Sequence, residues 1–387
     1  MAEQLYAPGE CYRYQLIIKH LLETPLFFAP GQEIVYRDRV RLTYRQLNDR
    51  IHRLAEGLAK LGVAAGDRVC VFDYDSHRYL ECFFAVPMMG AVLHTQNWRL
   101  SPEQILYTMN HAGDKIVLIH EDFLPLLDAI FPQLATVARI VLISDSGRRA
   151  ETPLPVAAEY EALLEGGSGG FDFPDLDENT QATIFYTTGT TGDPKGVHFT
   201  HRQLVLHAQA QMTGAAVYES VGRFRSNDVY MPLTPMFHVH AWGFPYVATM
   251  LGVKQVYPGK YEAPMLLKLI EREKVTFSHC VPTIVHMLLS SPDSATADLS
   301  RWRVTVGGAR LTRGLARQAM DRGIEIYTGY GMSEAGPVIA VANLKPSMLA
   351  WEKERQIDRL IMTGLPVPFV YARIIDASGN RLPHDGV

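Results

Sequence analysis

The sequence predicts an α/β fold, a multi-subdomain sandwich of mostly parallel sheets with flanking helices. Short and nearly continuous apolar runs at residues 69–72, 116–119 and 140–143 are typical of parallel strands buried on both faces. Helical patterns separate such runs. The clearest follows Thr43, a capping residue, and repeats leucine and isoleucine every three or four positions up to Leu61. Strands that alternate with helices in this way build parallel sheets.

The same alternation continues along the chain. Further helices are expected near residues 78–89, 101–110, 202–213 and 265–273, and further strands near 91–93, 253–257, 276–280, 304–306 and 324–326. Residues 370–376 alternate and lead into a turn at 377–380, which predicts the start of a small antiparallel β unit. We expect three units, at residues 1–170, 171–364 and 365–387, with a glycine-rich linker at 165–170.

Composition excludes several classes of protein. With 47% hydrophobic and 20% charged residues, the chain is typical of a globular protein in water. A net charge of −4 makes nucleic acid an unfavoured partner. We expect no membrane span, because no apolar run approaches about 20 residues. We also expect no signal peptide, because the N-terminus has no basic segment followed by an apolar run. The four cysteines have no CxxC spacing and are expected to be reduced thiols in a cytoplasmic protein.

The most informative segment is Tyr186–Gly196, YTTGTTGDPKG. Its glycines let the backbone approach an anion closely, and successive amides in such a turn form an anion-binding concavity. Unlike a P-loop, which leads into a helix, this segment lies between two strand patterns. We interpret it as a polyphosphate cradle rather than a flexible surface turn. Its binding residues would be Thr187, Thr188, Gly189, Thr190, Thr191, Gly192 and Lys195.

A second glycine-rich segment, YTGYGMSEAGP, covers residues 327–337. Tyr330 offers a flat face for a purine, Ser333 offers a hydroxyl for a phosphate, and Glu334 offers the hard oxygen that Mg²⁺ prefers. The alternative is a loop with a surface glutamate. Small residues at 307–309 end another predicted strand, where a flat ligand can approach closely, although they could simply lead into a helix.

The segment PMFHVHAW, residues 235–242, mixes aromatic, histidine and small side chains. Its His-x-His pattern can bind a metal, but no further ligand lies at convincing spacing. We expect it to line an apolar pocket, with His238 near the reacting group; a buried core segment is the alternative. A serine hydrolase has no support, because the sequence contains no G-x-S-x-G motif.

Together, in their order along the chain and at their spacings, the four segments resemble those of the adenylate-forming (AMP-binding) superfamily, which includes acyl-CoA synthetases, peptide-synthetase adenylation domains and luciferases. Residues 85–115 and 235–259 are most similar to bacterial fatty acyl-CoA synthetases, the long- and medium-chain fatty-acid–CoA ligases. The resemblance implies ATP-dependent activation of a fatty acid to an acyl-adenylate, followed by transfer to CoA. ATP or AMP, Mg²⁺ and CoA would be the cofactors and cosubstrates, and a homodimer is expected.

The resemblance also implies residue roles, in an acyl-CoA synthetase-like N-terminal domain. The cradle would hold the phosphates, the second unit would carry the cradle and the acyl pocket, and Trp242 would gate the acyl tunnel or, alternatively, pack in the core. The implied catalytic residues are Lys195, His238 and Glu334, with Glu334 also the Mg²⁺ ligand. Residues implied beside the nucleotide, with Tyr330 stacked on adenine, are Gly308, Ala309, Tyr330, Gly331 and Ser333. Those implied beside the acid are His238 and Trp242.

Family members also continue into a Tyr-x-Thr-Gly-Asp motif, a hinge and a mobile C-terminal domain, none of which this sequence contains. We therefore interpret the chain as the N-terminal part of such an enzyme, and expect weak nucleotide binding with little or no synthetase activity. Two other hypotheses remain open, a ligase for aryl or other small acids and a non-catalytic module that binds acyl groups or nucleotides. A charged residue at the closed end of the acyl pocket would favour the aryl ligase.

Overall fold

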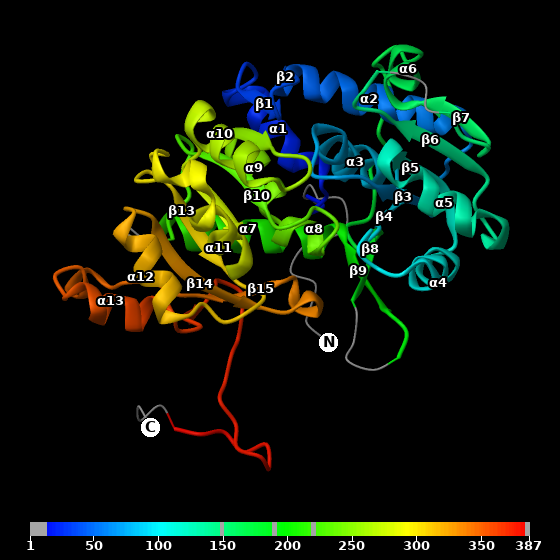
Figure 1. Ribbon diagram of the computed structural model, residues 1–387. Helices are drawn as coiled ribbons and strands as arrows, with labels where there is room; N and C mark the ends of the chain where they lie inside the picture. The colour runs from blue at the N-terminus through cyan, green and yellow to red at the C-terminus, as the bar shows by residue number, and fades with distance from the viewer. Residues whose placement is uncertain (1–13, 148–150, 188–191, 218–221, 384–387) are drawn as a thin grey trace.

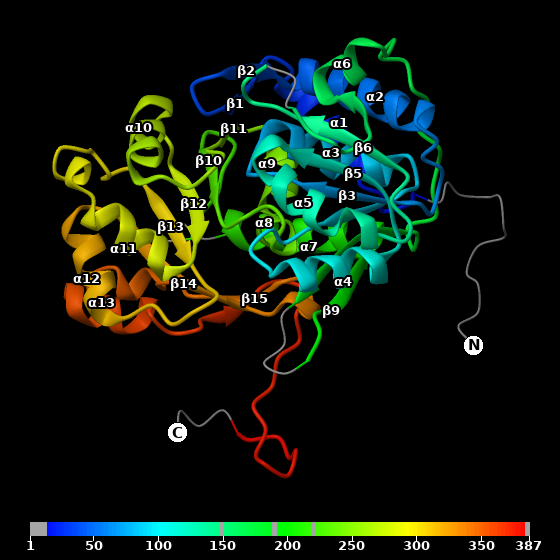
Figure 2. The same ribbon diagram turned by 45° about the vertical axis from the view of Figure 1, so that its right-hand side comes forward.

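The computed structural model describes residues 14–147, 151–187, 192–217 and 222–383. It confirms the predicted α/β sandwich with two largely parallel sheets (Figures 1 and 2). Helices cover both faces of each sheet, so the layers follow the order helix, sheet, helix, sheet, helix. The largest hydrophobic core lies in the central helical layer and joins the inner faces of the two sheets.

One sheet has seven strands in the order β7-β6-β5-β3-β4-β8-β9. Its strands are β3 (Arg68–Phe72), β4 (Val92–Thr95), β5 (Asp114–His120), β6 (Arg139–Ile143), β7 (Val156–Glu159), β8 (Gln181–Thr187) and β9 (Lys195–Thr200). Neighbouring strands are parallel except β8 and β9, which pair antiparallel across the glycine-rich loop. The predicted layout of strand, loop and strand is therefore confirmed.

The other sheet has nine strands in the order β16-β15-β14-β13-β12-β10-β11-β1-β2. They are β1 (Glu33–Tyr36), β2 (Val40–Thr43), β10 (Val229–Leu233), β11 (Lys254–Tyr257), β12 (Phe277–Cys280), β13 (Arg303–Val306), β14 (Glu325–Gly331), β15 (Val338–Val341) and β16 (Leu365–Pro366). Its central strands are parallel, and β2, β15 and β16 add antiparallel edges. Because β1 and β2 lie in this sheet while β8 and β9 lie in the other, sheet membership crosses the predicted boundary at residue 170. The division into units stays a prediction.

The helices divide among the three helical layers. The central layer contains α1 (Lys19–Phe28), α2 (Tyr44–Lys60), α3 (His77–Met88), α7 (His201–Val217) and α9 (Phe244–Leu251). Outside the seven-stranded sheet lie α4 (Pro102–Ala112) and α5 (Leu124–Ile130), while α6 (Tyr160–Glu165) packs on α2. Outside the nine-stranded sheet lie α10 (Ala263–Glu273), α11 (Pro282–Ser290), α12 (Arg313–Asp321) and α13 (Lys353–Leu360).

Helix α2 shows how closely the local sequence determines an element. Thr43 and Gln46 form a reciprocal capping box at its start. Leu47, Ile51 and Leu54 are fully buried on the face that packs against the core. Burial of each such side chain contributes about 1.5–3 kcal/mol relative to exposure, so the apolar stripe fixes which face of the helix turns inward.

The last described residues leave the body of the molecule (Figure 1). Where the sequence predicts an antiparallel unit, the structure has a turn at residues 377–380 and one antiparallel bridge between Ile375 and Arg381. Three of the four cysteines lie in the described residues, and all three are free and buried as expected. In the described part of the chain, we find no helix with the length and apolar character of a membrane span.

Candidate active site

A cavity of about 110 Å³ lies at the carboxyl ends of β13 and β14, beside the predicted pocket segment. Open α/β sheets bind ligands at such strand ends. We call it the adenylate cavity, after the ligand that the sequence resemblance implies. Its lining brings together residues from three of the four sequence segments; they are His238, Val239, Trp242, Phe244, Thr305, Gly307, Gly308, Gly329, Tyr330, Gly331, Met332, Ser333, Pro337, Val338 and Val341.

Two hydrogen bonds from the seven-stranded sheet fix the backbone that precedes His238. The carboxylate of Asp75, just after β3, accepts the N–H of Met236 at 2.8 Å. The hydroxyl of Thr95, at the end of β4, donates to the carbonyl of Phe237 at 3.0 Å. The backbone that leads to His238 is therefore held from the seven-stranded sheet. Desolvation by the surrounding protein lowers the pKa of His238, and the charge of Arg99 lowers it further.

Trp242 closes one side of the adenylate cavity from α8 (Val239–Trp242). These four residues, none of them glycine, all have φ between 49° and 57°, a left-handed conformation that costs roughly 1–2 kcal/mol per residue. The indole lies so close to Gly307 that a Cβ there would come within 2.9 Å of Cη2. Glycine at this position therefore lets the indole come this close to the end of β13.

The hairpin of β14 and β15 forms the opposite side. Tyr330 lines the cavity with 49% of its surface exposed, so its ring face is accessible to a flat ligand. Ser333 also lines the cavity, at the start of the 3₁₀ turn Ser333–Ala335. Glu334 in the same turn is exposed and is not part of the lining. Ala309 is likewise exposed, one residue beyond the lining.

The phosphate cradle is described only at its edges. Thr187 ends β8 opposite Lys195, which begins β9 and is exposed. Within the described ranges, no carboxylate forms an ion pair with Lys195, so its charge is available to an anion. Gly192 has φ of +88°, in the left-handed region. Thr188, Gly189, Thr190 and Thr191 lie outside the described residues.

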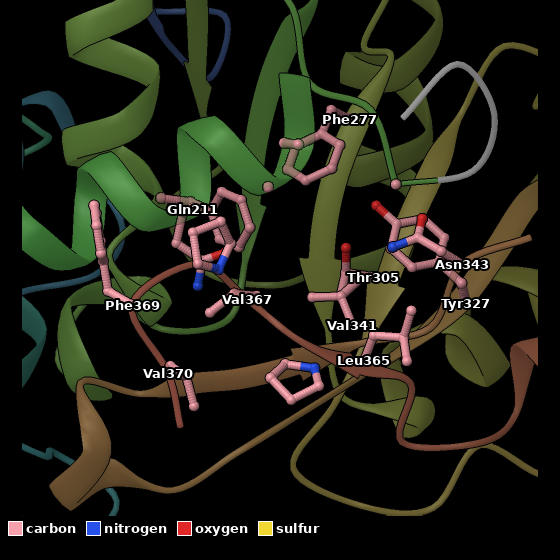
Figure 3. A pocket seen from close by; sticks show the side chains of 16 residues that line it. Gln211, Phe277, Thr305, Tyr327, Val341, Asn343, Leu365, Val367, Phe369 and Val370 are labelled. Atoms are coloured by element: carbon pink, nitrogen blue, oxygen red, sulfur yellow. The ribbon is translucent and has the colours of Figure 1, made fainter. Parts of the chain in front are cut away.

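A second cavity, of about 300 Å³, adjoins the first. Figure 3 shows side chains that line it. We call it the acyl cavity, after the acyl pocket that the sequence resemblance implies. The two cavities share Phe244, Thr305 and Val341 as walls. The other lining residues are Gln211, Gly214, Ala215, Gly222, Phe277, Tyr327, Asn343, Leu365, Pro366, Val367, Pro368, Phe369 and Val370. None of these side chains is charged, and most are apolar.

Several residues that build the site lie outside the four sequence segments described above. His207 and Gln211 lie on one face of α7, four residues apart, and Gln211 faces the acyl cavity. Asp75 belongs to a polar run, Asp73–Ser76, that directly follows a buried strand. Polar residues at the carboxyl end of a parallel strand are a signal that could have identified Asp75.

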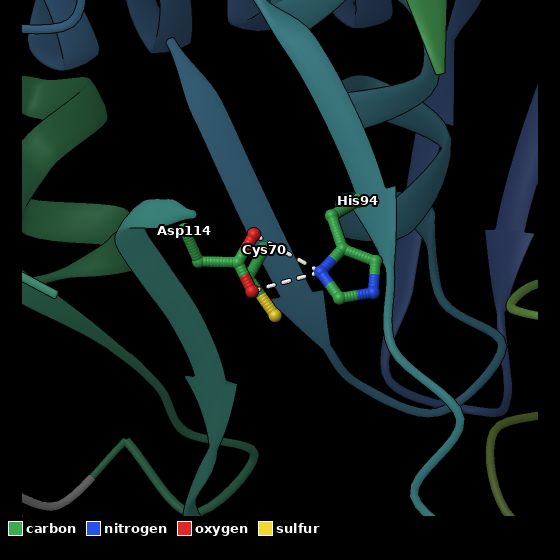
Figure 4. Close-up of side chains that lie close together, drawn as sticks. All are labelled: Cys70, His94 and Asp114. Carbon is green, nitrogen blue, oxygen red and sulfur yellow. Dashed lines mark hydrogen bonds and ion pairs between the residues drawn. The ribbon is translucent and has the colours of Figure 1, made fainter. Parts of the chain in front are cut away.

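A separate cluster, Cys70, His94 and Asp114, places three metal-ligating side chains within 4.8 Å of one another (Figure 4). The residues come from β3, β4 and β5 and are fully buried. His94 Nδ1 lies 2.8 Å from a carboxylate oxygen of Asp114, and burial raises the pKa of the Cys70 thiol. The histidine and carboxylate thus satisfy each other, and the cluster links strands away from both cavities.

These features place the chain among α/β proteins with a ligand cavity at the carboxyl ends of parallel strands. The chain belongs to the AMP-binding enzyme family, whose model matches residues 28–387. It is 40% identical over 350 residues to a long-chain-fatty-acid–CoA ligase of Thermus thermophilus, covering 89% of this chain and 62% of the relative. A medium-chain-fatty-acid–CoA ligase of Ectopseudomonas oleovorans is 34% identical over 385 residues, covering 98% of this chain and 70% of the relative.

Solved structures support the same fold. An anthranilate CoA ligase in complex with anthranoyl-AMP superposes with a TM-score of 0.81 at 22% identity, over 96% of this chain and 67% of that one. The N-terminal domain of FACL13 from Mycobacterium tuberculosis gives a TM-score of 0.77 at 23% identity, over 95% of this chain and 86% of that one. The chain thus spans about three fifths of the Thermus relative and most of a solved N-terminal domain.

Proposed function

We propose that this chain binds ATP and a medium-chain fatty acid for an AMP-forming acyl-CoA ligase. In the proposed reaction, a carboxylate oxygen attacks the α-phosphorus of ATP and pyrophosphate leaves. The thiol of CoA then attacks the acyl carbon of the adenylate and AMP leaves. Both steps develop negative charge, which Lys195 and the cradle amides are suited to stabilise.

The observation that carries this proposal is the acyl cavity, which is uncharged and shares three walls with the adenylate cavity. The acyl cavity has a volume of about 300 Å³ and a mostly apolar lining, which suits the hydrocarbon chain of a medium-chain fatty acid. Among the described residues, no charged side chain lines this cavity, which disfavours a ligase for small aryl acids. Relatives named as long- and medium-chain fatty-acid–CoA ligases support the same substrate class.

Binding to non-hydrolysable acyl-sulfamoyl adenosines tests the proposal directly on this chain. We expect affinity to rise with acyl length and to be greatest for a medium-chain acyl group, because each methylene buried in the acyl cavity contributes about 0.8 kcal/mol. Isothermal titration calorimetry with a graded series measures this. The tightest binding by the benzoyl analogue, or an affinity independent of chain length, would contradict the proposal.

Two finer points belong to the same proposal. Glu334, exposed near the adenylate cavity, would ligate a Mg²⁺ ion that neutralises the ATP phosphates, and the carboxylate is a suitable ligand for that ion. We also propose that the protein forms a homodimer. Sedimentation equilibrium over a range of concentrations tests this, and a mass that stays monomeric at micromolar concentration would overturn it.

A further inference from the structure

His207, in the middle of α7, contacts three parts of the site at once. The N–H of Val338, a wall of the adenylate cavity, donates to His207 Nε2 at 3.4 Å. The side-chain amide of Gln211, a wall of the acyl cavity, lies 3.1 Å from the same nitrogen. One atom therefore receives hydrogen bonds from the walls of both cavities.

The imidazole also packs against the residue that follows the Trp242 turn. A Cβ on Gly243 would come within 2.6 Å of His207 Nδ1, so only glycine allows this approach. On the other side, a Cβ on Gly336 would lie 3.5 Å from His207 Cδ2, at ordinary contact distance. The ring thus fills the space between the turn that carries Trp242 and the hairpin that carries Tyr330.

The chemistry of the ring allows one arrangement of protons. A backbone N–H can only donate, so Nε2 must be unprotonated to accept from Val338, and the proton lies on Nδ1. Burial lowers the pKa of His207 to about 3, so the ring is neutral at pH 7 and keeps this acceptor. Because both donors share Nε2, a movement of either donor changes the hydrogen bond that this nitrogen accepts from the other.

We propose that His207 is a positioning residue that couples the two cavities, so that an acyl ligand and a nucleotide each bind more tightly when the other is present. This inference rests on the proposed function. Movement of Gln211 around an acyl chain shifts the imidazole. The imidazole then moves the Val338 hairpin beside the nucleotide and Gly243 beside Trp242. Such coupling is reciprocal, because each ligand must change the affinity for the other by the same factor.

Calorimetry with decanoate and a non-hydrolysable ATP analogue measures this factor in both orders of addition. In the wild-type chain we expect about fivefold or more, the lower end of typical couplings. His207→Leu cannot accept a hydrogen bond and should reduce the coupling factor to about one. Each ligand alone should bind the variant within about threefold of its affinity for the wild-type chain. His207→Gln, which presents a carbonyl acceptor, should restore most of the coupling. His201→Leu, a buried neutral histidine on the same helix but bonded to Ile18, is the matched control and should retain it.

A His207→Leu variant that keeps the wild-type factor overturns the inference, as does a wild-type chain that binds both ligands without coupling. If His207→Leu fails to fold, Gln211→Leu replaces it, because that change removes only the donor on the acyl side and should also lower the factor. An unchanged factor in Gln211→Leu is then the contrary result. Failure of the wild-type chain to bind decanoate at all contradicts the proposed function instead.

Discussion

Asp75 accepts a hydrogen bond from the N–H of Met236 at 2.8 Å, although 161 residues separate them in the chain. Its other carboxylate oxygen accepts from the hydroxyl of Tyr261 at 2.5 Å. The carboxyl group is thereby the link between the loop after β3 and the segment that carries His238. Burial raises its pKa to about 7 despite these two donors.

The raised pKa of Asp75 predicts a pH-dependent stability. The folded state holds the proton more strongly than the unfolded state, whose pKa is about 4. The resulting stabilisation is complete below pH 4 and is lost as the pH rises to 7. Asp75→Asn cannot titrate and should not lose this stabilisation. As the pH rises from 5 to 8, the free energy of unfolding of the variant should therefore gain about 2–3 kcal/mol relative to that of wild type. Urea unfolding at both pH values measures this. Asp128→Asn, on an exposed part of α5, should show no such gain.

Lys195 should distinguish ATP from AMP. Lys195 is exposed and begins β9 at the end of the cradle, where the proposed function places the outer phosphates rather than the adenosine. We expect Lys195→Ala to weaken ATP binding by about 10–100-fold and AMP binding by less than about threefold. Titration of both nucleotides tests the difference. Lys345→Ala removes an exposed lysine elsewhere and serves as the control. Equal losses for the two nucleotides would place Lys195 away from the outer phosphates.

The ring of Tyr330 should provide the stacking surface for adenine. Base stacking on an aromatic side chain contributes about 1–3 kcal/mol, so Tyr330→Ala should lower AMP affinity by at least about fivefold. Tyr330→Phe keeps the ring face and should bind AMP within about twofold of wild type. If the Phe variant loses as much affinity as the Ala variant, the hydroxyl rather than the ring face carries the interaction.

Glu334 should mediate the effect of Mg²⁺. Its carboxylate is exposed beside Ser333 and has no ion-pair partner in the described residues. Glu334→Gln should reduce the enhancement of ATP binding by Mg²⁺ by about tenfold, since an amide oxygen is a weaker ligand for a hard cation. Binding of AMP without metal should not change. An enhancement equal to wild type would remove Glu334 from the metal site.

The sequence predicts local features of this molecule far better than long-range contacts. The capping box at Thr43 and the strands around the glycine-rich loop follow from patterns within a few residues. The contact of His207 with Val338 joins positions 131 residues apart, and a helical pattern shows that a residue faces inward without naming its partner. The left-handed turn at Val239–Trp242 is equally hard to predict from the sequence, because non-glycine residues rarely adopt positive φ.

The acyl cavity should set the preferred chain length, and Ala215 on α7 offers a way to shorten it. Ala215→Leu adds three carbons to a wall of the cavity and so reduces its volume of about 300 Å³. The optimum of the acyl-sulfamoyl adenosine series should therefore shift to shorter acids, with butanoyl binding little affected. Ala216→Leu makes the same change on the exposed side of the helix and should leave the optimum in place. An identical optimum in both variants would show that the acyl chain occupies a different space.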